Sequence, residues 1–310
     1  MNKPDFIMLV GLPGSGKSTF AKELAKDGTV ICSSDEVRER ICGDKNCQDN
    51  NNEVFKILHR EIKENLRSGK SCIYDATNIS SKRRRAFLAE LKNIYCVKTC
   101  IIIATLYEKC QEFNSKRVNP VPKEVIKKMY LNWNTPYWFE GWDDIEVEYR
   151  NFEEREYFGF PKSYVQKFID YNQDNSNHNL SLGNHLKETR RIVNEWEWIT
   201  GKEDISLKVA ALLHDIGKPF TKCFIDSKGN ESQDAHYYQH HCVGAYDSLF
   251  FKTISNTIDH SILINLHMMP YFWEQDKEYG EKTRLKYKKL WGEDLYEKVM
   301  SLHNADKLAH

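Results

Sequence analysis

The chain has 310 residues, of which 40% are hydrophobic and 12% aromatic, so two domains of ordinary size can each bury a core. No apolar run approaches the roughly 18 residues that a membrane span needs. The amino terminus shows no signal-peptide pattern. The nine cysteines are odd in number and show no CxxC spacing, which favours reduced thiols over a cysteine zinc site. We therefore expect a cytoplasmic protein with no membrane partner. We also expect the protein to be bacterial or phage-encoded.

The formal net charge is zero, but the two halves of the chain differ. Residues 1–150 carry 25 lysines and arginines against 21 aspartates and glutamates, and residues 151–310 carry 20 against 24. A mildly basic first half suits an anionic substrate, although chance explains so small a difference equally well. Ten of the eleven histidines lie after residue 170, and a metal site in the second half would account for this skew.

In the first half, short apolar runs alternate with stretches of helical spacing. The predicted strands are 6–10, 30–32, 72–75, 98–106 and 145–149. The predicted helices are 18–26, 54–66, 83–91 and 124–133. Short apolar strands bounded by helices predict an α/β domain with a parallel sheet and helices on both faces.

From about residue 180 the chain has helical spacing, with Asn- and Gly-rich breaks at 172–183 and 226–232. Residues 150–170 are charged and aromatic with little periodicity, so we place the junction there. The sequence therefore predicts an α/β domain at 1–150 and an all-α domain at 151–310.

The sequence GLPGSGKS at positions 11–18 has the form G-x-x-x-x-G-K-S and lies between a predicted strand and a predicted helix. Glycines let the backbone N–H groups approach phosphate, and the following helix points its positive end at the anion. Lys17 is expected to bridge the β- and γ-phosphates of ATP or GTP, and the Ser18 hydroxyl to hold Mg²⁺. The candidate nucleotide-binding residues of this loop are Gly14, Ser15, Gly16, Lys17, Ser18 and Thr19.

Asp35 and Arg38 follow the second strand, near the edge where a parallel sheet gathers ligands. A carboxylate there can accept the proton of an attacking hydroxyl, and an arginine one turn later can hold a phosphate of the acceptor. A capped helix with Arg38 in solvent explains the same pattern equally well.

Asp75 ends the third strand. It lies either near Mg²⁺ or its water shell, or in a structural bond to the loop. Arg83, Arg84 and Arg85 are predicted to be a solvated helix start rather than a nucleic-acid contact.

Residues 6–140 resemble the kinase domain of polynucleotide kinases, including the bacteriophage kinase-phosphatase. The resemblance is carried by the loop at 11–18, SDEVR at 34–38, DATN at 75–78, the arginines at 83–85, NSKR at 114–117, VP at 121–122 and VI at 125–126. It implies that Asp35 is the general base for a 5′-hydroxyl and that Arg38 contacts the neighbouring 3′-phosphate. Arg117 would be the lid arginine on the donor phosphates. Phe113 stands where the family usually has an arginine, so this chain departs from the family in its lid.

The adjacent pair His214 and Asp215 ends an apolar helical run at 207–213. Further histidines and a carboxylate lie on both sides of it, and the whole candidate set is His185, His214, Asp215, His240, His267 and Asp306. Imidazole nitrogens and carboxylate oxygens without thiolates suit Mn²⁺, Fe²⁺, Co²⁺, Ni²⁺ or Zn²⁺.

Residues 178–310 resemble the HD phosphohydrolase superfamily in the order H…HD…H…H…D. The resemblance implies that His185, His214, Asp215 and Asp306 bind one metal, and that His240 and His267 join Asp215 at a second in two-metal members. Lys218 either neutralises the scissile phosphate or is solvated. For four other histidines, His178, His236, His241 and His260, the sequence favours surface or structural roles. A substrate contact of His178, and an approach of His236 or His260 to the site, are the alternatives.

Together the two resemblances imply an end-healing enzyme that phosphorylates 5′-hydroxyl ends of RNA or DNA. Its second domain would hydrolyse 3′-phosphate, 2′-phosphate or 2′,3′-cyclic phosphate ends, and a separate ligase would act next. One alternative is a small-molecule or nucleoside kinase joined to a nucleotide phosphohydrolase. Another is a non-catalytic nucleotide sensor, against which the retained site residues argue.

Overall fold

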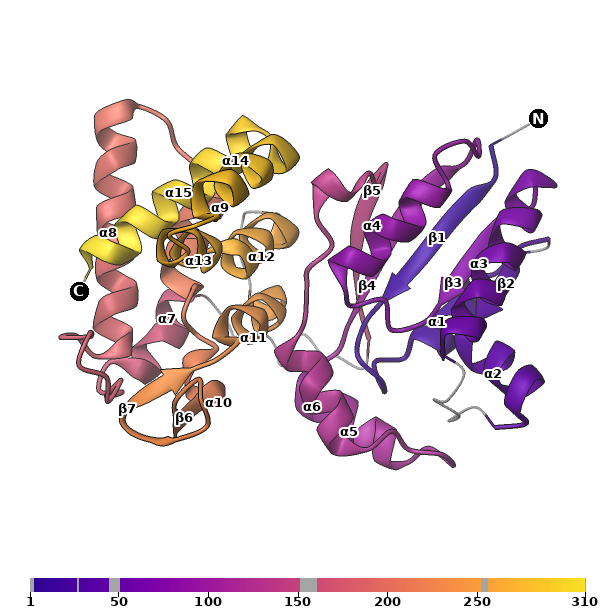
Figure 1. Ribbon diagram of the computed structural model, residues 1–310, viewed down its shortest axis with the longest axis horizontal. Coiled ribbons are helices and arrows are strands. Elements are labelled where there is room, and N and C mark those ends of the chain that lie inside the picture. Colours follow the sequence, from indigo (N-terminus) through magenta and orange to yellow (C-terminus); the bar gives the residue numbers. More distant parts are fainter. Residues whose placement is uncertain (1–2, 27, 45–50, 151–160, 252–255, 310) are drawn as a thin grey trace. The chain divides into compact units, whose positions relative to one another are not determined.

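The computed structural model describes residues 3–26, 28–44, 51–150, 161–251 and 256–309, and it contains two compact units (Figure 1). The first unit comprises Met1–Tyr130 and Pro136–Glu153, and the second comprises Leu131–Thr135 and Glu154–His310. Part of the predicted junction, 151–160, lies outside the described residues. None of the described helices is both long and apolar enough to cross a lipid bilayer.

The first unit is built on a five-stranded parallel sheet in the order β2-β3-β1-β4-β5. Its strands are β1 Asp5–Val10, β2 Val30–Ser33, β3 Cys72–Asp75, β4 Val97–Ala104 and β5 Asp144–Tyr149. All five predicted strands are confirmed, although β4 ends two residues earlier than expected. Because neighbouring strands run parallel, their carboxyl ends lie at one edge, where β1 leads into the glycine loop and β2 into Asp35.

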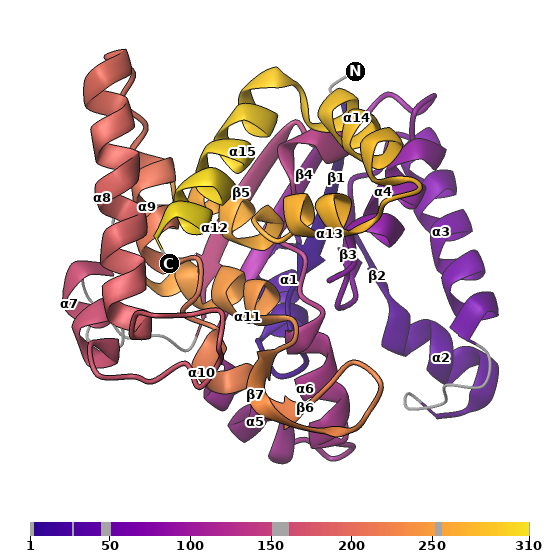
Figure 2. The ribbon, with the colours of Figure 1, turned by 60° about the vertical axis from the view of Figure 1, so that its left-hand side comes forward.

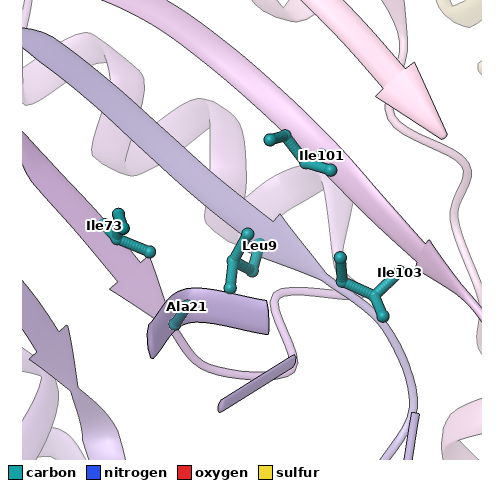
Figure 3. Close-up of a cluster of buried hydrophobic side chains, with 5 residues drawn as sticks. All are labelled: Leu9, Ala21, Ile73, Ile101 and Ile103. Carbon is teal, nitrogen blue, oxygen red and sulfur yellow. The ribbon is translucent and has the colours of Figure 1, made fainter. Parts of the chain in front are cut away.

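The helices of this unit flank the sheet. They are α1 Lys17–Leu24, α2 Ser34–Cys42, α3 Asn51–Arg67, α4 Ser81–Glu90, α5 Tyr107–Ser115, α6 Lys123–Leu131 and the 3₁₀ helix η1 Trp138–Glu140. Figure 3 shows Ala21 of α1 packed against Leu9, Ile73, Ile101 and Ile103 of three strands. This buried cluster fixes the start of α1, and therefore the glycine loop before it, against the sheet.

One arginine of the run at 83–85 is buried, so the prediction that the whole run is solvated is wrong for Arg84. Its guanidinium donates to both carboxylate oxygens of Glu140 at 2.8 and 2.7 Å, and the indole N–H of Trp142 donates to the same carboxylate at 3.0 Å. Arg84 also donates to the carbonyl of Asn78 at 2.8 Å, and the Asn78 amide donates to Leu9 at 2.9 Å. The buried pair thus holds the turn after β3 against the end of β1.

The second unit is helical, as the sequence predicts, apart from one hairpin. Its helices are α7 Pro161–Val165, η3 Gln166–Phe168, α8 Leu182–Thr200, α9 Ile205–Leu213, α10 Lys218–Thr221, α11 His240–Asp247, η4 Ser248–Phe250, α12 Thr257–Leu266, α13 Met269–Gln275, α14 Gly280–Trp291 and α15 Glu293–Leu308. The hairpin consists of β6 Lys222–Ile225 and β7 Glu231–Tyr237 (Figure 2). Its turn coincides with the predicted break at 226–232.

Helix α9 lies at the centre of the second unit. Residues 209–213 are buried without a polar stripe, because α8, α12 and α15 all pack against this helix. Asp204 caps its start by accepting from the N–H of Leu207 at 2.9 Å. The helix ends at Leu213, which places His214 and Asp215 in the interior of the unit.

Five residues of the first predicted domain, Leu131–Thr135, pack within the helical unit. The buried ring of Trp133 meets Tyr246 edge to face at 4.8 Å between centroids. The N–H of Thr135 donates to the Asn265 amide oxygen at 3.2 Å, and the Asn265 amide donates back to the Trp133 carbonyl at 3.1 Å. Helix α6 therefore ends two residues before the predicted position 133, because Trp133 is buried in the other unit's core.

We expect Glu140→Gln to lower the free energy of unfolding by about 3–5 kcal/mol, since it leaves the Arg84 charge buried and uncompensated. Urea titration of the full chain measures this. The matched control is Glu61→Gln, which removes an exposed pair with Arg40 and should cost ~1 kcal/mol or less. Equal losses in the two variants would contradict the structural role of the buried pair.

Candidate active sites

The glycine loop at the end of β1 has the backbone shape of a phosphate cradle. Gly14 and Gly16 have positive φ angles of 83° and 95°. A Cβ atom on Gly14 would lie 2.2 Å from the carbonyl oxygen of Cys110 in α5, so a side chain here would collide with backbone. Helix α1 starts directly after Gly16 and points its amino end at the loop.

Lys17 is folded into this loop. Its ammonium donates to the Leu12 carbonyl at 2.8 Å and to the Ser15 hydroxyl at 3.3 Å. Burial lowers the pKa of Lys17 despite the nearby Asp75 carboxylate. The charge therefore lies inside the cradle, where the phosphates of a nucleotide bind.

Ser18 and Asp75 meet at the edge of the cradle. The Ser18 hydroxyl donates to the Asp75 carboxylate at 2.6 Å, and burial raises the pKa of Asp75. The carboxylate is thus bonded to the loop and also lies beside the predicted Mg²⁺ ligand, so the structure is consistent with both interpretations of Asp75. Thr19 lies one residue further along α1 and is exposed.

Asp35 lies in the first turn of α2, beside two arginines. Its carboxylate oxygens lie 2.9 Å from Arg38 and 3.5 Å from Arg117. Arg38 is 11% exposed and also donates to Ser34 at 3.4 Å and to Asn51 at 3.1 Å. The alternative of a solvated Arg38 is therefore wrong. Its buried Nε–H has no hydrogen-bond partner among the residues that the structure describes.

Arg117 reaches this site because two hydrogen bonds hold the loop after α5 in place. The buried Asn114 side chain donates to the Val121 carbonyl at 2.8 Å and accepts from the Val121 N–H at 3.0 Å. Helix α5 itself lies against the cradle through the contact of Cys110 with Gly14. Arg117, which is 43% exposed, extends from this loop to Asp35.

The six metal-ligand candidates converge in the interior of the helical unit. The candidates form two groups that share Asp215, and within each group the ligand atoms lie within 4.8 Å of one another. The first group is His185, His214, Asp215 and Asp306. The second group is Asp215, His240 and His267. All six side chains are buried. They come from α8, the end of α9, the start of α11, the end of α12, and α15.

The hydrogen bonds of the four imidazoles fit a metal centre. Each Nδ1 atom lies at hydrogen-bond distance from a backbone carbonyl: His185 at 3.2 Å, His214 at 3.0 Å, and His240 and His267 both at 2.7 Å. Donation from Nδ1 leaves each Nε2 as the unprotonated ligand atom, which is the arrangement of metal-binding histidines. The Nε2 atoms lie 3.2 Å apart in the pairs His185–His214 and His240–His267. The donor set therefore fits divalent transition metals.

The two oxygens of Asp215 face different groups. Oδ2 lies 3.5 Å from both His185 and His214, whereas Oδ1 lies 3.1 Å from His240 and 3.8 Å from His267. Burial raises the pKa of a carboxyl group, but Lys218 and the imidazoles outweigh it and hold the pKa of Asp215 well below its usual range. One carboxylate thus offers one oxygen to each group of candidate metal ligands.

Lys218 is buried, so the solvated alternative is wrong. Its ammonium lies 2.6 Å from Asp215, 2.7 Å from the Gln173 amide oxygen and 3.3 Å from His178. The sequence analysis missed Gln173, and it also missed Tyr271, whose hydroxyl donates to Asp306 at 3.0 Å. No spacing pattern singles out these two residues, because they act only through partners distant in sequence.

The other histidines that the structure describes lie outside both ligand groups. His260 is completely buried and bonds through Nε2 to the Ser248 carbonyl at 3.0 Å, so a surface role for it is wrong. His241 follows His240 on α11, and its ring centre lies 6.2 Å from that of His267. His236 lies on β7.

Comparison with known families matches two parts of the chain. Residues 6–136 match the model of the AAA domain, and residues 182–309 match the model of the HD domain. The chain joins a P-loop kinase domain to an HD domain. These two expectations of the sequence analysis are confirmed. A kinase domain of this type implies a nucleotide with Mg²⁺, and an HD domain implies divalent metal ions.

The similar proteins each match less than half of this chain. The L-seryl-tRNA(Sec) kinase of Methanococcus maripaludis is 31% identical over 155 residues, which are 46% of this chain and 58% of that protein. Protein kti12 of Schizosaccharomyces pombe is 25% identical over 151 residues, 44% of this chain and 54% of that protein. The solved Pnkp1/Rnl/Hen1 RNA repair complex has a chain with 26% identity and a TM-score of 0.37, covering 43% of this chain and 44% of that one. This chain thus spans just over half the length of the two curated relatives.

We expect the two ligand groups to lose metal separately. After dialysis against Mn²⁺, wild-type protein should hold two ions per chain, His185→Ala and His267→Ala one each, and Asp215→Ala none, because Asp215 belongs to both groups. Elemental analysis measures the stoichiometry. His236→Ala is the matched control and should keep both ions. An Asp215→Ala protein that retained two ions would contradict the bridging arrangement.

Proposed function

We propose that the kinase domain transfers the γ-phosphate of ATP or GTP to the 5′-hydroxyl of an RNA or DNA end. In the same proposal the HD domain hydrolyses a 3′-phosphate, a 2′-phosphate or a 2′,3′-cyclic phosphate. The single observation that carries the proposal is the pairing of Asp35 with a nearly buried Arg38 beside the cradle. The carboxylate suits a hydroxyl acceptor, and the guanidinium suits a phosphate on that acceptor.

In the transfer step, the acceptor oxygen forms a bond to the γ-phosphorus while the bond from that phosphorus to the β,γ-bridging oxygen breaks. Asp35 accepts the hydroxyl proton, and the nucleoside diphosphate leaves. Lys17 and the loop N–H groups stabilise the charge on the transferred phosphoryl group, and Arg117, which lies beside Asp35, adds a further positive charge. The unpartnered Nε–H of Arg38 is a donor suited to the acceptor's phosphate.

In the HD domain, His185, His214, Asp215 and Asp306 would hold one metal ion, and His240 and His267 would share Asp215 in holding a second. Bound metal ions supply a water nucleophile at neutral pH and stabilise the leaving oxygen. Lys218 lies beside Asp215 and is positioned to neutralise a phosphate at the centre. Tyr271 donates to Asp306 and keeps that carboxylate oriented.

One of the relatives supports an acceptor attached to RNA. One relative is by name a kinase of L-seryl-tRNA(Sec), so an acceptor attached to RNA is compatible with a domain of this type. A 5′-phosphate and a 3′-hydroxyl are the ends that a ligase joins. We therefore propose a separate ligase as the enzyme acting next.

We expect the two activities to be separable by substitution. Asp35→Ala should lower the rate of 5′-phosphorylation by about 10²–10⁴-fold, because it removes the general base. Lys17→Ala should abolish transfer. Both variants should retain hydrolysis of 3′-phosphate or cyclic phosphate ends, and Asp215→Ala should show the reverse. End-labelling of 5′-hydroxyl oligonucleotides measures transfer, with Glu36→Ala, an exposed neighbour on α2, as control. Undiminished transfer in Asp35→Ala would exclude it as the base.

The Arg38→Ala variant tests whether the natural acceptor carries a phosphate or is a small molecule without one. Wild-type protein should prefer nucleoside 3′-phosphates to nucleosides, and the variant should lose about 10–100-fold of that preference, since a hydrogen bond to a charged group is worth about 1.5–3 kcal/mol. Steady-state kinetics with both acceptors measures the preference. Equal use of both acceptors by wild-type protein would favour the small-molecule alternative.

A further inference from the structure

The β6–β7 hairpin carries a stacked aromatic pair, of which Tyr238 is exposed and His236 is half-buried. His236 of β7 and Tyr238, one residue past its end, are two positions apart and so lie on one face. Their rings stack with centroids 5.6 Å apart and planes 4° apart. Tyr238 is 44% exposed, and its hydroxyl donates to the Ile225 carbonyl at 3.2 Å, which fixes the ring over β6. We call this pair, His236 and Tyr238, the aromatic platform.

The opposite face of the hairpin is tied to the metal centre. The Tyr237 hydroxyl donates to the Gln173 carbonyl, and the Tyr237 carbonyl lies 2.7 Å from Nδ1 of His240. The Lys218 ammonium lies 5.3 Å from the Tyr237 ring centre and 2.6 Å from Asp215. Tyr238 precedes the ligand His240 by two residues, so their Cα atoms lie within about 7 Å. The platform therefore lies close to a candidate metal ligand along the chain, on the face of the hairpin opposite to the Tyr237 side chain.

The charges of the hairpin favour contact with the aromatic rings of a ligand over contact with its phosphates. Of its two lysines, Lys222 is paired with Asp174 at 2.5 Å and Lys228 lies in the turn. Two of its carboxylates are occupied locally: Asp226 accepts from N–H groups of the turn, and Asp234 accepts from the Ser176 hydroxyl at 2.7 Å. With no surplus of positive charge, the hairpin has little attraction for a phosphate backbone. Exposed aromatic rings, in contrast, stack on any nucleobase.

We propose that the aromatic platform stacks the terminal bases of a single-stranded nucleic acid whose phosphorylated end occupies the metal centre. This inference rests on the proposed function, and it adds single-strandedness and length as requirements of the substrate. In a duplex the bases stack on one another, so a splayed single-stranded end presents its base faces to such rings more readily. A mononucleotide places its phosphate in the same centre but has no further base for the platform.

The test compares kcat/KM for a single-stranded oligonucleotide carrying a 3′-phosphate or cyclic phosphate with kcat/KM for p-nitrophenyl phosphate. Alanine at a stacking ring weakens binding on the order of tenfold per base. Tyr238→Ala should therefore lower the ratio of the two values about tenfold, through a higher KM for the oligonucleotide. Tyr238→Phe keeps the ring and should keep the ratio. Trp198→Ala, an 87% exposed aromatic on α8, is the matched control and should leave the ratio unchanged.

Two results would overturn the inference about the platform. One is a Tyr238→Ala ratio equal to that of wild type. The other is a Tyr238→Phe variant that loses as much as Tyr238→Ala, which would assign the effect to the hydroxyl bond with Ile225. Failure of the proposed function is distinguishable, because wild-type protein would then hydrolyse p-nitrophenyl phosphate but none of the oligonucleotide ends. In that outcome the aromatic platform would also have no nucleic-acid substrate to stack.

Discussion

The helical unit depends on the contacts of the buried Asp215 carboxylate with Lys218 and with the surrounding imidazoles. The carboxylate lies in the interior beside Lys218, and its two oxygens face two separate sets of imidazoles. A buried carboxylate is stable only with such partners. The apolar helix α9 places it there, and α8, α12 and α15 close around that helix. The same carboxylate therefore links the packing of the unit to both groups of candidate metal ligands.

The kinase unit must also hold its ligand site in a fixed geometry, but it does so with backbone groups instead of a buried carboxylate. Its phosphate site is made of backbone, so it depends on the shape of the loop more than on a charged ligand set. That shape is supported from two sides: Ala21 packs on the sheet, and the buried pair of Arg84 with Glu140 anchors the turn that precedes α4. Asp35 and Arg38 are then added at the end of the adjacent strand β2, where the parallel topology gathers them.

Local patterns were sufficient for the strands of the sheet and for the positions of the candidate ligands, but not for helix α5 or the β6–β7 hairpin. The loop at 11–18 is contiguous, and the strands of the sheet are short apolar runs. Partnerships between distant residues could not be predicted. Arg84 and Glu140 are 56 positions apart, and Lys218 and Gln173 are 45 apart. A charged run such as 83–85 has the same composition whether or not one member is buried. The burial of Trp133 in the second unit likewise depends on Tyr246 and Asn265, which no local signal identifies.

The most direct measurement of the central claim uses one broken RNA strand with a 5′-hydroxyl on one fragment and a 2′,3′-cyclic phosphate on the other. The protein is incubated with ATP, Mg²⁺ and Mn²⁺, and a ligase that joins only 5′-phosphate to 3′-hydroxyl is added afterwards. Our account predicts a sealed strand that depends on both domains. An unsealed strand, with the same preparation phosphorylating nucleosides or hydrolysing free nucleotides, would contradict it.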